Sequence, residues 1–494
     1  MARSVFPTLI LSAATLWIAV PATAQNSPLV VEPFSLRGFD GTEQVVELGR
    51  LTVAADRDDP ASGTIELAFV RLPATGERLG SPIVFLAGGP GVPGIVMGQV
   101  PVYRSLFDRL RATGDVILLD QRGSGRSTPS LECPADASLP ADFLLDAYSA
   151  LAALLPPLDR CADRLRTQGV DPSDYTTTAS ADDVEDLRRA LGAEKIRILG
   201  FSYGTELAMA YTRRHAESVE RLVLAAVRPP WSVVKLPSAY DAAIASISAL
   251  AARDTAAGIP DFEGDLRTVL ARLEEEPVPL ILADRRSGAQ VEVQAGKFAL
   301  QGILQGGLAD GRAMPRQVAM VAALERGELE PFRRELETLY NALGNGIGMM
   351  GIAMNCSAGW PPDRRSQASA EAATALLGDV MNLMLTPGAC AIAGDPDIGP
   401  EYRVRVESEV PALFLSGSLD PNAPPSQAEE ALRGFPRGIH VVVENGSHET
   451  LPAEEVQVLV ADFLAEMDVT GRVVTLPFPR FPTPAEILTG PPGP

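Results

Sequence analysis

Residues 196–204 read Ile-Arg-Ile-Leu-Gly-Phe-Ser-Tyr-Gly, and this stretch decides the fold. Its first part, residues 196–199, is a short, mostly apolar run that is typical of a strand covered on both faces. Its second part is a Gly-x-Ser-x-Gly pattern that opens a helix. In such a strand-turn-helix context the turn exposes the serine hydroxyl, and the glycines let the backbone approach closely. The stretch therefore predicts Ser202 as a nucleophile.

Other apolar runs predict the rest of a parallel sheet. Short runs of this kind lie at residues 83–87, 116–119, 222–226, 412–415 and 440–443. Helical patterns separate them, and two longer runs, 45–53 and 64–72, are joined by a turn-rich segment that predicts an antiparallel pair at the sheet edge. Strands that alternate with helices favour an α/β fold with a mostly parallel, doubly wound sheet.

The strand rhythm stops in the middle of the chain. Between about residues 229 and 402 helical patterns dominate, which predicts an inserted cap. Five segments are expected: a signal peptide (1–24), the first part of an α/β core (25–228), a helical cap (229–404), the second part of the core (405–475) and a tail (476–494). The tail is rich in proline and glycine, so we expect it to be extended over the surface or disordered.

The amino terminus has the order of an export signal. Met1-Ala2-Arg3 is followed by an apolar stretch at residues 5–20 and by Pro21-Ala22-Thr23-Ala24. A membrane anchor is the alternative, but the apolar stretch is shorter than the roughly 20 residues that a spanning helix needs. We therefore expect cleavage after Ala24 and a soluble mature protein in the periplasm or outside the cell.

The charge balance disfavours several kinds of partner. The chain has 42 Lys and Arg against 63 Asp and Glu, a net charge of −21. A field of this sign repels phosphate backbones and anionic membrane surfaces, so neither a nucleic acid nor a membrane is an expected partner. The sequence does not determine the oligomeric state.

Four cysteines, at Cys133, Cys161, Cys356 and Cys390, point to disulfides rather than to a metal. An even number of cysteines in an exported chain usually pairs, and three pairings are possible. Pairing the neighbours in sequence closes the shortest loops. No Cys-x-x-Cys spacing is present, so no metal site is expected, and the predicted chemistry needs no cofactor.

A serine nucleophile needs a base, and the chain has only three histidines. His215 ends the helix that begins at Ser202, where a cation favours the helix dipole, so a structural role is expected. His440 lies inside a predicted strand. His448 follows the last predicted strand in the loop 444–448, the place for a general base, and is the predicted one.

The third residue of a triad is expected after the preceding strand. Residues 416–421 read Ser-Gly-Ser-Leu-Asp-Pro and supply Asp420. Its carboxylate is predicted to hold the tautomer of His448 and to stabilise the imidazolium. The alternative is an aspartate that only caps its own turn. The order Ser202, Asp420, His448 is that of the α/β-hydrolase fold.

Acyl transfer also needs donors for the developing oxyanion. Residues 87–91, Ala-Gly-Gly-Pro-Gly, follow the strand predicted at 83–87. The backbone N–H groups of Tyr203 and Gly89 are the predicted donors, with Gly88 in support, because Pro90 has no N–H and glycine lets the loop fold tightly.

Residues 120–127, Asp-Gln-Arg-Gly-Ser-Gly-Arg-Ser, resemble the Asp-Gln-Arg-Gly-x-Gly-x-Ser segment of the prolyl aminopeptidase and tripeptidyl aminopeptidase (TAP-like) family of α/β hydrolases. Residues 88–91 resemble the same family. The paired cysteines of this chain also resemble those of exported members of the family. The resemblance implies release of residues or short peptides from a free N-terminus by Ser202, Asp420 and His448 beneath a helical cap. For Asp120, Arg122 and Arg126 we expect a structural role, bracing the oxyanion loop.

The sequence departs from this family at two points. Ala87 stands where many prolyl aminopeptidases have histidine, and residues 357–360, Ser-Ala-Gly-Trp, lack the expected acidic residue. An exopeptidase must pair the substrate ammonium with a carboxylate. Glu206 and Asp241 are available, but the sequence does not choose between them and the cap acids. The flexible apolar segment 346–354 either lines a pocket or packs as cap core.

Three hypotheses follow from the sequence. The leading one is an exported serine hydrolase, an aminopeptidase that forms an acyl-enzyme on Ser202. The alternative is a carboxylesterase or amidase that uses the same triad on an apolar substrate. The third is a binding protein on an inactive hydrolase scaffold, which the intact triad disfavours. The expected partner is thus a peptide or a small ester or amide.

Overall fold

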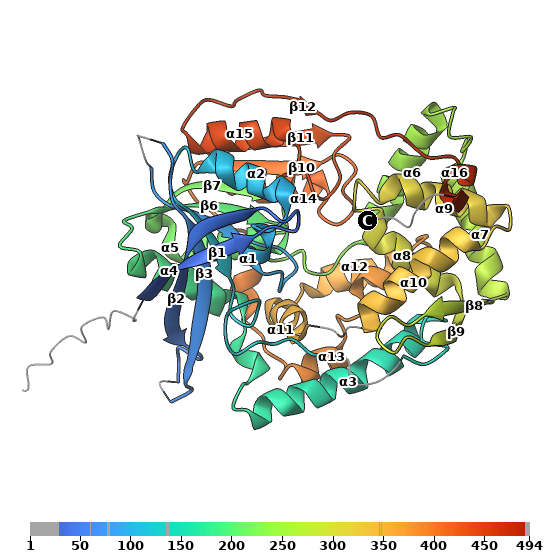
Figure 1. Cartoon of the computed structure of the whole chain (residues 1–494), viewed down its shortest axis with the longest axis horizontal. Coiled ribbons are helices and arrows are strands. Elements are labelled where there is room, and N and C mark those ends of the chain that lie inside the picture. The colour runs from blue at the N-terminus through green and yellow to red at the C-terminus, as the bar shows by residue number, and fades with distance from the viewer. Residues whose placement is uncertain are drawn as a thin grey trace, which may run out of the picture.

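The structure is a computed structural model that describes residues 29–59, 61–76, 80–134, 139–344, 346 and 348–489. The predicted signal peptide, residues 1–24, lies outside the described residues. A ten-stranded sheet, in the order β1-β2-β3-β5-β4-β6-β7-β10-β11-β12, forms one half of the molecule, and a largely helical part forms the other (Figure 1). The strands are β1 (Leu29–Arg37), β2 (Glu43–Ala54), β3 (Thr64–Leu72), β4 (Ile83–Leu86), β5 (Val116–Asp120), β6 (Ile196–Phe201), β7 (Val219–Ala225), β10 (Ala412–Gly417), β11 (Gly438–Glu444) and β12 (Val474–Thr475).

The pairing confirms a mostly parallel sheet with an antiparallel edge. The seven strands β5, β4, β6, β7, β10, β11 and β12, in this order across the sheet, pair in parallel. The remaining strands form the antiparallel edge, in which β1 pairs with β2, β2 with β3 and β3 with β5. The predicted edge pair corresponds to β2 and β3. The outermost strand β1 was not predicted, because most of its side chains are exposed and it lacks a buried alternating pattern.

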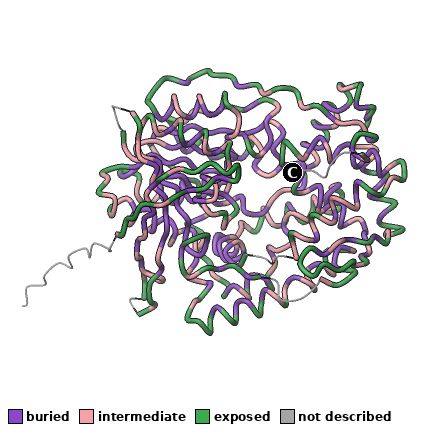
Figure 2. The backbone as a smooth tube through the Cα atoms, in the orientation of Figure 1, coloured by how far each residue is buried: buried purple, intermediate pink, exposed green. Residues whose placement is uncertain are grey.

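Both faces of the central parallel strands, β4, β5, β6, β7 and β10, are buried, which explains their apolar sequences. Ile198 and Leu222 pack with α4 (Thr177–Ala190) and α5 (Tyr203–His215) on one face. Their neighbours Leu199 and Val223 pack with helices on the opposite face, α2 (Pro101–Leu110) and α15 (Glu454–Leu464). Purple, buried backbone accordingly fills the centre of the sheet in Figure 2. The sheet is doubly wound, as predicted.

Between β7 and β10 the chain builds a second body with its own hydrophobic core. Three helices of this stretch, α11 (Met349–Ala358), α12 (Pro362–Ala372) and α13 (Pro387–Ile392), pack with the hydrophobic core of the sheet half. The helices of the second body are α6 (Pro237–Arg253), α7 (Phe262–Glu275), α8 (Lys297–Gly307), α9 (Met314–Glu325), α10 (Glu330–Gly344) and η3 (Val380–Asn382). This part, called the cap below, is not purely helical. An antiparallel hairpin, β8 (Val278–Ala283) with β9 (Gln290–Ala295), corrects the expectation that strands are missing here, because alternate residues of both strands are buried.

Two segments outside the predicted cap range contribute to its core. Phe143 and Leu144, just before α3 (Ala147–Thr167), are buried in it, although the sequence placed them with the first part of the α/β core. The tail contributes as well: residues 484–489 form α16 (Pro484–Thr489), and Phe481 and Ile487 are buried in the cap core. The expectation of an extended or disordered tail is therefore wrong for residues 484–489, whereas residues 476–483 form no helix or strand.

The cysteines are paired in sequence order. Cys133 bonds Cys161 in α3, and Cys356 in α11 bonds Cys390 in α13, with Cα–Cα distances of 5.7 and 5.4 Å. These are the two shortest loops among the possible pairings.

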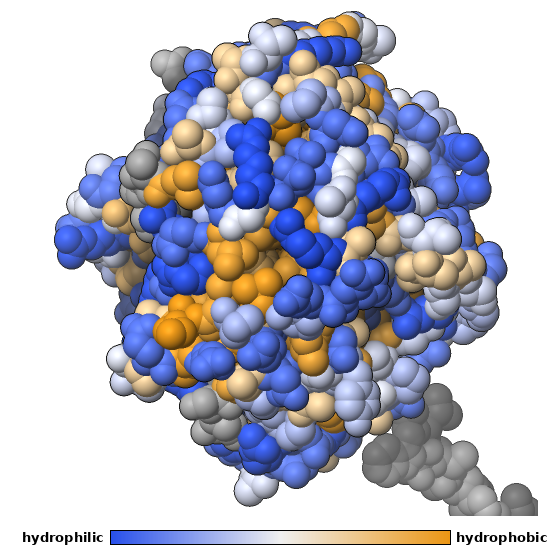
Figure 3. Space-filling view, turned by 90° about the vertical axis from the view of Figure 1, so that its right-hand side faces the viewer, coloured by the Kyte–Doolittle hydropathy of each residue, from blue (hydrophilic) through white to orange (hydrophobic). Residues whose placement is uncertain are grey.

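Within the described residues, every helix is too short or too polar to cross a membrane. Seen from the cap side, apolar side chains gather in one area of a largely hydrophilic surface (Figure 3).

Candidate active site

Ser202 stands at a strained turn between β6 and α5. Its backbone has φ 53° and ψ −120°, a region that costs a residue other than glycine about 1–3 kcal/mol. Its N–H donates to the carbonyl of Ala225, 2.9 Å away, at the end of β7. A Cβ atom on Gly200 would lie 2.6 Å from the Gly204 carbonyl oxygen, and one on Gly204 would lie 1.9 Å from that of Leu86. Both glycines of the pattern are therefore required by contact with backbone.

We expect Gly204→Ala to destabilise the protein by about 3 kcal/mol or more, because backbone rather than a movable side chain occupies the space. Urea unfolding monitored by circular dichroism measures the effect. Gly306→Ala in α8 is the matched control, since a Cβ there meets no atom within 4 Å, and it should raise stability by up to about 1 kcal/mol. Equal midpoints for the two variants would contradict the packing argument.

Three side chains from separate strand ends form one hydrogen-bonded line. The Nε2 atom of His448 lies 3.0 Å from Ser202 Oγ, and its Nδ1 atom lies 2.8 Å from Asp420 Oδ2. Ser202 follows β6, Asp420 follows β10 and His448 follows β11. Since carboxyl ends of parallel strands share one sheet edge, the topology brings all three together. The three side chains have the geometry of a Ser-His-Asp triad.

Asp420 uses its two carboxylate oxygens differently. Oδ2 faces His448, whereas Oδ1 accepts hydrogen bonds from the N–H groups of Asn422 and Ala423 at 2.8 and 3.0 Å. The carboxylate therefore caps its own turn and contacts the histidine at once. The two sequence interpretations of Asp420 do not exclude each other, because the capping bonds fix the carboxylate that orients the ring.

The cap holds the loop that carries His448. The N–H of His448 donates to the carbonyl of Ala309, 3.1 Å away, and the N–H of Gly311 donates to Ser447 Oγ at 3.0 Å. Ala309 and Gly311 lie between α8 and α9. Sequence reasoning missed these contacts, because they depend on how the cap sits on the core and leave no local pattern.

The other two histidines have structural surroundings. His215 Nε2 lies 3.4 Å from Asp182 Oδ1 at the end of α5. His440 Nε2 lies 3.1 Å from Ser416 Oγ within the sheet, and burial lowers the pKa of its imidazole. Neither ring contacts Ser202.

The glycine loop after β4 lies against Ser202. A Cβ on Gly88 would lie 3.0 Å from Ser202 Cβ, and Gly89 has φ +106°, a conformation that L side chains rarely adopt. Gly89 lines the same cavity as Ser202 and His448. Tyr203 is the first residue of α5, so its N–H belongs to the unpaired helix start. The structure thus places both residues of the predicted oxyanion donors beside the serine.

The predicted bracing residues behave differently from one another. Asp120 accepts hydrogen bonds from the N–H groups of Ile95 and Arg126, each at 2.8 Å, and burial raises the pKa of its carboxyl to about 6. It thereby anchors the chain just after the glycine loop, where α1 (Gly94–Met97) begins. Gln121 donates to the carbonyl of Ala87 at 3.1 Å and holds the other end of that loop.

For Arg122 the expectation of bracing this loop is wrong. The fully buried guanidinium instead donates to both carboxylate oxygens of Asp183 in α4, each at 2.7 Å, and to the carbonyls of Ala55 and Asp174. It ties the antiparallel edge to α4. Arg126 contributes its backbone N–H to Asp120, while its guanidinium lies over the ring of Phe34.

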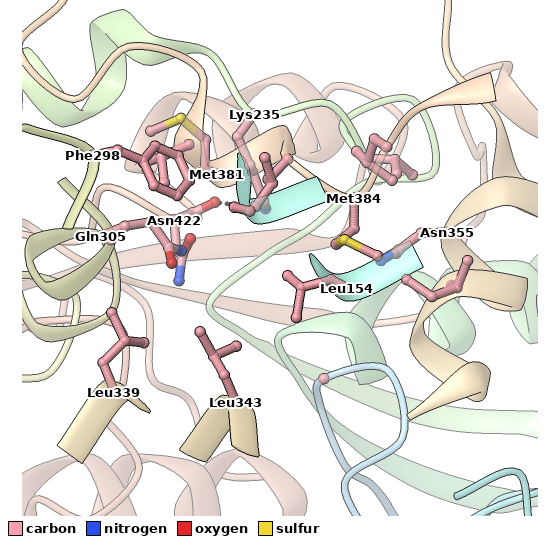
Figure 4. Close-up of a pocket in the computed structure, with 18 of the residues that line it drawn as sticks. Leu154, Lys235, Phe298, Gln305, Leu339, Leu343, Asn355, Met381, Met384 and Asn422 are labelled. Carbon is pink, nitrogen blue, oxygen red and sulfur yellow. Dashed lines mark hydrogen bonds between the residues drawn. The ribbon is translucent and has the colours of Figure 1, made fainter. Parts of the chain in front are cut away.

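A cavity of about 440 Å³ lies between the triad and the cap. Much of its wall is apolar, and the side chains of this kind that Figure 4 labels are Leu154, Phe298, Leu339, Leu343, Met381 and Met384. The charged residues that line it are Arg228 and Lys235, both basic. No aspartate or glutamate of the described chain lines it. The cavity suits a substrate with an apolar part and offers cations but no carboxylate.

The carboxylates considered from the sequence lie elsewhere. Glu206 is fully buried; its Oε2 lies 2.9 Å from Arg228 Nε, and its Oε1 accepts a hydrogen bond from Tyr402 at 2.7 Å. Asp241 accepts a hydrogen bond from the N–H of Leu376. Of the segment 346–354, Ile352 lines the cavity, whereas Met349 and Met354 are buried in the core. The described part of that segment therefore serves mainly as core, but it packs with the sheet half and not with the core of the cap.

Two family models match the chain. Residues 81–291 match the model described as alpha/beta hydrolase fold, and residues 375–473 match the one described as TAP-like protein. The first range contains Ser202 and the second contains Asp420 and His448, so the matched segments hold all three residues of the hydrogen-bonded line.

Several curated proteins are similar to part of the chain. Serine protease Hip1 of Mycobacterium tuberculosis is 32% identical over 184 residues, 36% of this chain and 35% of the relative. Carboxylesterase B of the same organism is 33% identical over 173 residues (35% and 28%), and a probable proline iminopeptidase of Leptolyngbya boryana is 30% identical over 150 residues (30% and 32%). The similarity thus spans about a third of each relative's length.

Proposed function

From the chain's membership of the α/β-hydrolase superfamily, with a TAP-like carboxyl-terminal segment, we propose that it is an exported serine hydrolase with Ser202 as nucleophile. The observation that carries the proposal is the line from Asp420 Oδ2 through His448 to Ser202 Oγ, with distances of 2.8 and 3.0 Å. This line borders a cavity large enough for a small substrate.

The proposed reaction is acyl transfer to serine and then to water. His448 accepts the hydroxyl proton as Ser202 attacks the substrate carbonyl, and Asp420 stabilises the imidazolium that forms. The N–H groups of Gly89 and Tyr203 donate to the oxyanion. His448 then returns the proton to the leaving group, and water releases the acyl group from Ser202 by the same route in reverse.

The cavity favours an ester or amide with an apolar acyl group as substrate. The aminopeptidase alternative is supported by the TAP-like match and by the names of two relatives, a serine protease and a probable proline iminopeptidase. However, a substrate ammonium that is buried in the cavity needs a carboxylate as its partner. Among the described residues that line the cavity, Arg228 and Lys235 carry positive charge, and none is an aspartate or glutamate. The carboxylesterase name of a third relative agrees with the ester interpretation.

The test compares three sets of chromogenic substrates: peptides with free N-termini, the same peptides with blocked N-termini, and simple acyl esters. The wild-type protein and Ser202→Ala are assayed side by side. We expect Ser202-dependent hydrolysis to be fastest with esters or blocked substrates. Fastest cleavage of peptides with a free N-terminus would instead establish an aminopeptidase. If a fluorophosphonate probe did not react with Ser202, the result would favour a binding protein on an inactive hydrolase scaffold.

Export is the other part of the proposal. It is supported by the signal-like order of residues 1–24 and by the two disulfides, which persist in oxidising compartments. Amino-terminal sequencing of protein recovered from the periplasm or the medium should begin at Gln25. Full-length chain retained in the cytoplasm would contradict export.

A further inference from the structure

Lys235 is a cavity cation that the proposed triad does not use. It lies between β7 and α6, near Asn422 (Figure 4). It lines the cavity together with Ser202 and His448. Its backbone is fixed on both sides by one buried amide: the Lys235 N–H donates to Asn382 Oδ1 at 2.8 Å, and Asn382 Nδ2 donates to the Lys235 carbonyl at 2.9 Å. These two hydrogen bonds fix the backbone from which the lysine side chain projects.

The ammonium group is held beside the turn that carries Asp420. Its Nζ donates to the carbonyl of Asn422 at 2.7 Å, and the N–H of Asn422 in turn donates to Asp420 Oδ1. An ammonium has three donors, so this bond leaves two for a ligand or water. Lys235 therefore presents a positively charged donor to the cavity close to the triad.

The two cavity cations differ in how they are compensated. Arg228 pairs with Glu206 at 2.9 Å and donates to Asn355 Oδ1 at 2.6 Å, so its charge is balanced within the protein. Lys235 forms no ion pair with any carboxylate of the described chain, and its hydrogen-bond acceptor is a neutral carbonyl. Within the described part of the chain, Lys235 is thus a cation without a carboxylate partner in a largely apolar cavity.

We propose that this cavity selects substrates that carry a carboxylate at the far end of an apolar acyl chain, with Lys235 as the residue that binds the carboxylate. The inference rests on the proposed function, since it names the substrate class of the same Ser202 site. A substrate carboxylate supplies the missing counter-charge, and the apolar wall accommodates the chain between it and the scissile carbonyl. A substrate ammonium at the same place is repelled.

The pH dependence adds an independent readout. Burial lowers the pKa of Lys235 to about 7, and Arg228 and Arg364 act in the same direction, while Asp420 and Glu206 oppose it. The ammonium is thus charged below pH 7 and loses its charge as the pH rises through 7. A carboxylate substrate, with a pKa of about 4, stays ionised throughout this range.

The experiment uses 4-nitrophenyl half-esters of the six-, eight- and ten-carbon dicarboxylic acids. Each is compared with the neutral diester whose far carboxyl is a methyl ester, so that the ratio of the two kcat/KM values isolates the charge. Rates of Ser202→Ala are subtracted. Lys235→Met removes the charge at similar length, Lys235→Arg restores it, and Lys195→Met is the same substitution at an exposed position.

For at least one chain length, the half-ester to diester ratio is expected to fall about 10-fold or more in Lys235→Met, and to stay near the wild-type value in Lys235→Arg and Lys195→Met. In the wild type the ratio should decline above pH 7, while Lys235→Arg keeps it to pH 9. The ratio cancels any effect of pH that the two substrates share.

Two outcomes overturn the inference while leaving the proposed function standing. One is an unchanged ratio in Lys235→Met, which would reduce Lys235 to a positioning residue for the Asp420 turn. The other is a ratio in the wild type that does not vary between pH 5.5 and 9, a result that needs no folded variant. Absence of Ser202-dependent hydrolysis of every ester would instead remove the proposed function itself.

Discussion

Ser202→Ala is expected to lower kcat/KM for the best substrate by roughly 10⁵- to 10⁶-fold, the loss that removal of a triad serine causes elsewhere. The reason is geometric: Ser202 Oγ is the atom that His448 Nε2 faces at 3.0 Å, so no other hydroxyl can take its place without a rearrangement of the turn. Initial rates of purified protein measure the loss. The residual rate reports what the oxyanion donors and substrate binding supply alone.

The fold should not change in this variant. Alanine at position 202 keeps the same positive φ and removes one oxygen, so the thermal midpoint is expected to stay within a few degrees of the wild type. Ser232→Ala is the matched control, because that serine is also buried but only donates to the carbonyl of Pro229. Its activity should stay within a few-fold of the wild type.

Covalent labelling supplies the decisive complement. A fluorophosphonate should modify the wild type at Ser202, as read by mass spectrometry of the labelled peptide, and should not modify Ser202→Ala. Labelling of another serine would place the nucleophile elsewhere. So would more than about 1% residual activity in Ser202→Ala, because such a loss of about 100-fold is roughly a thousand times smaller than the expected loss.

The sequence could predict the sheet and the three residues of the line because both follow from local patterns. Each of Ser202, Asp420 and His448 lies in the turn or loop that follows an apolar run, and each of these runs forms a strand of the parallel sheet. Parallel pairing of those strands then places their carboxyl ends at one edge, whatever the intervening helices do. Strand periodicity and chain order were therefore sufficient.

The cavity could not be predicted in this way. Leu154, Leu339 and Met384 meet there from segments far apart in the chain, and their contacts depend on how cap helices pack rather than on any period. The proposed role of Lys235 depends likewise on Asn382 and Asn422, which lie 147 and 187 residues further along the chain. An isolated lysine in a linker gives no sequence signal.

The wrong expectations have the same physical origin. Arg122 belongs to a motif that suggested bracing of the glycine loop, yet the buried partner that fixes its position, Asp183, lies 61 residues away in α4. The tail was expected to be extended or disordered because of its proline content. Its residues 484–489 nevertheless form α16, and the side chains of Phe481 and Ile487 are buried in the core of the cap. In both cases tertiary contact outweighed local composition.

The last prediction concerns Asp420→Asn, which should lower kcat by about 10⁴-fold with little loss of stability. The retained carbonyl oxygen can still accept hydrogen bonds from the N–H groups of Asn422 and Ala423, as Oδ1 now does. The new NH₂ group then faces His448 Nδ1 and forces that nitrogen to accept. The proton moves to Nε2, which can no longer take the proton of Ser202.

Asp420→Ala separates the two tasks of this carboxylate. Alanine removes the capping bonds as well as the contact with His448, so this variant should lose a similar amount of activity and also about 1–3 kcal/mol of stability. Steady-state kinetics and urea unfolding of both variants provide the comparison. If Asp420→Asn kept more than a tenth of the wild-type kcat, Asp420 would be a turn residue only, and another acidic group would have to orient His448.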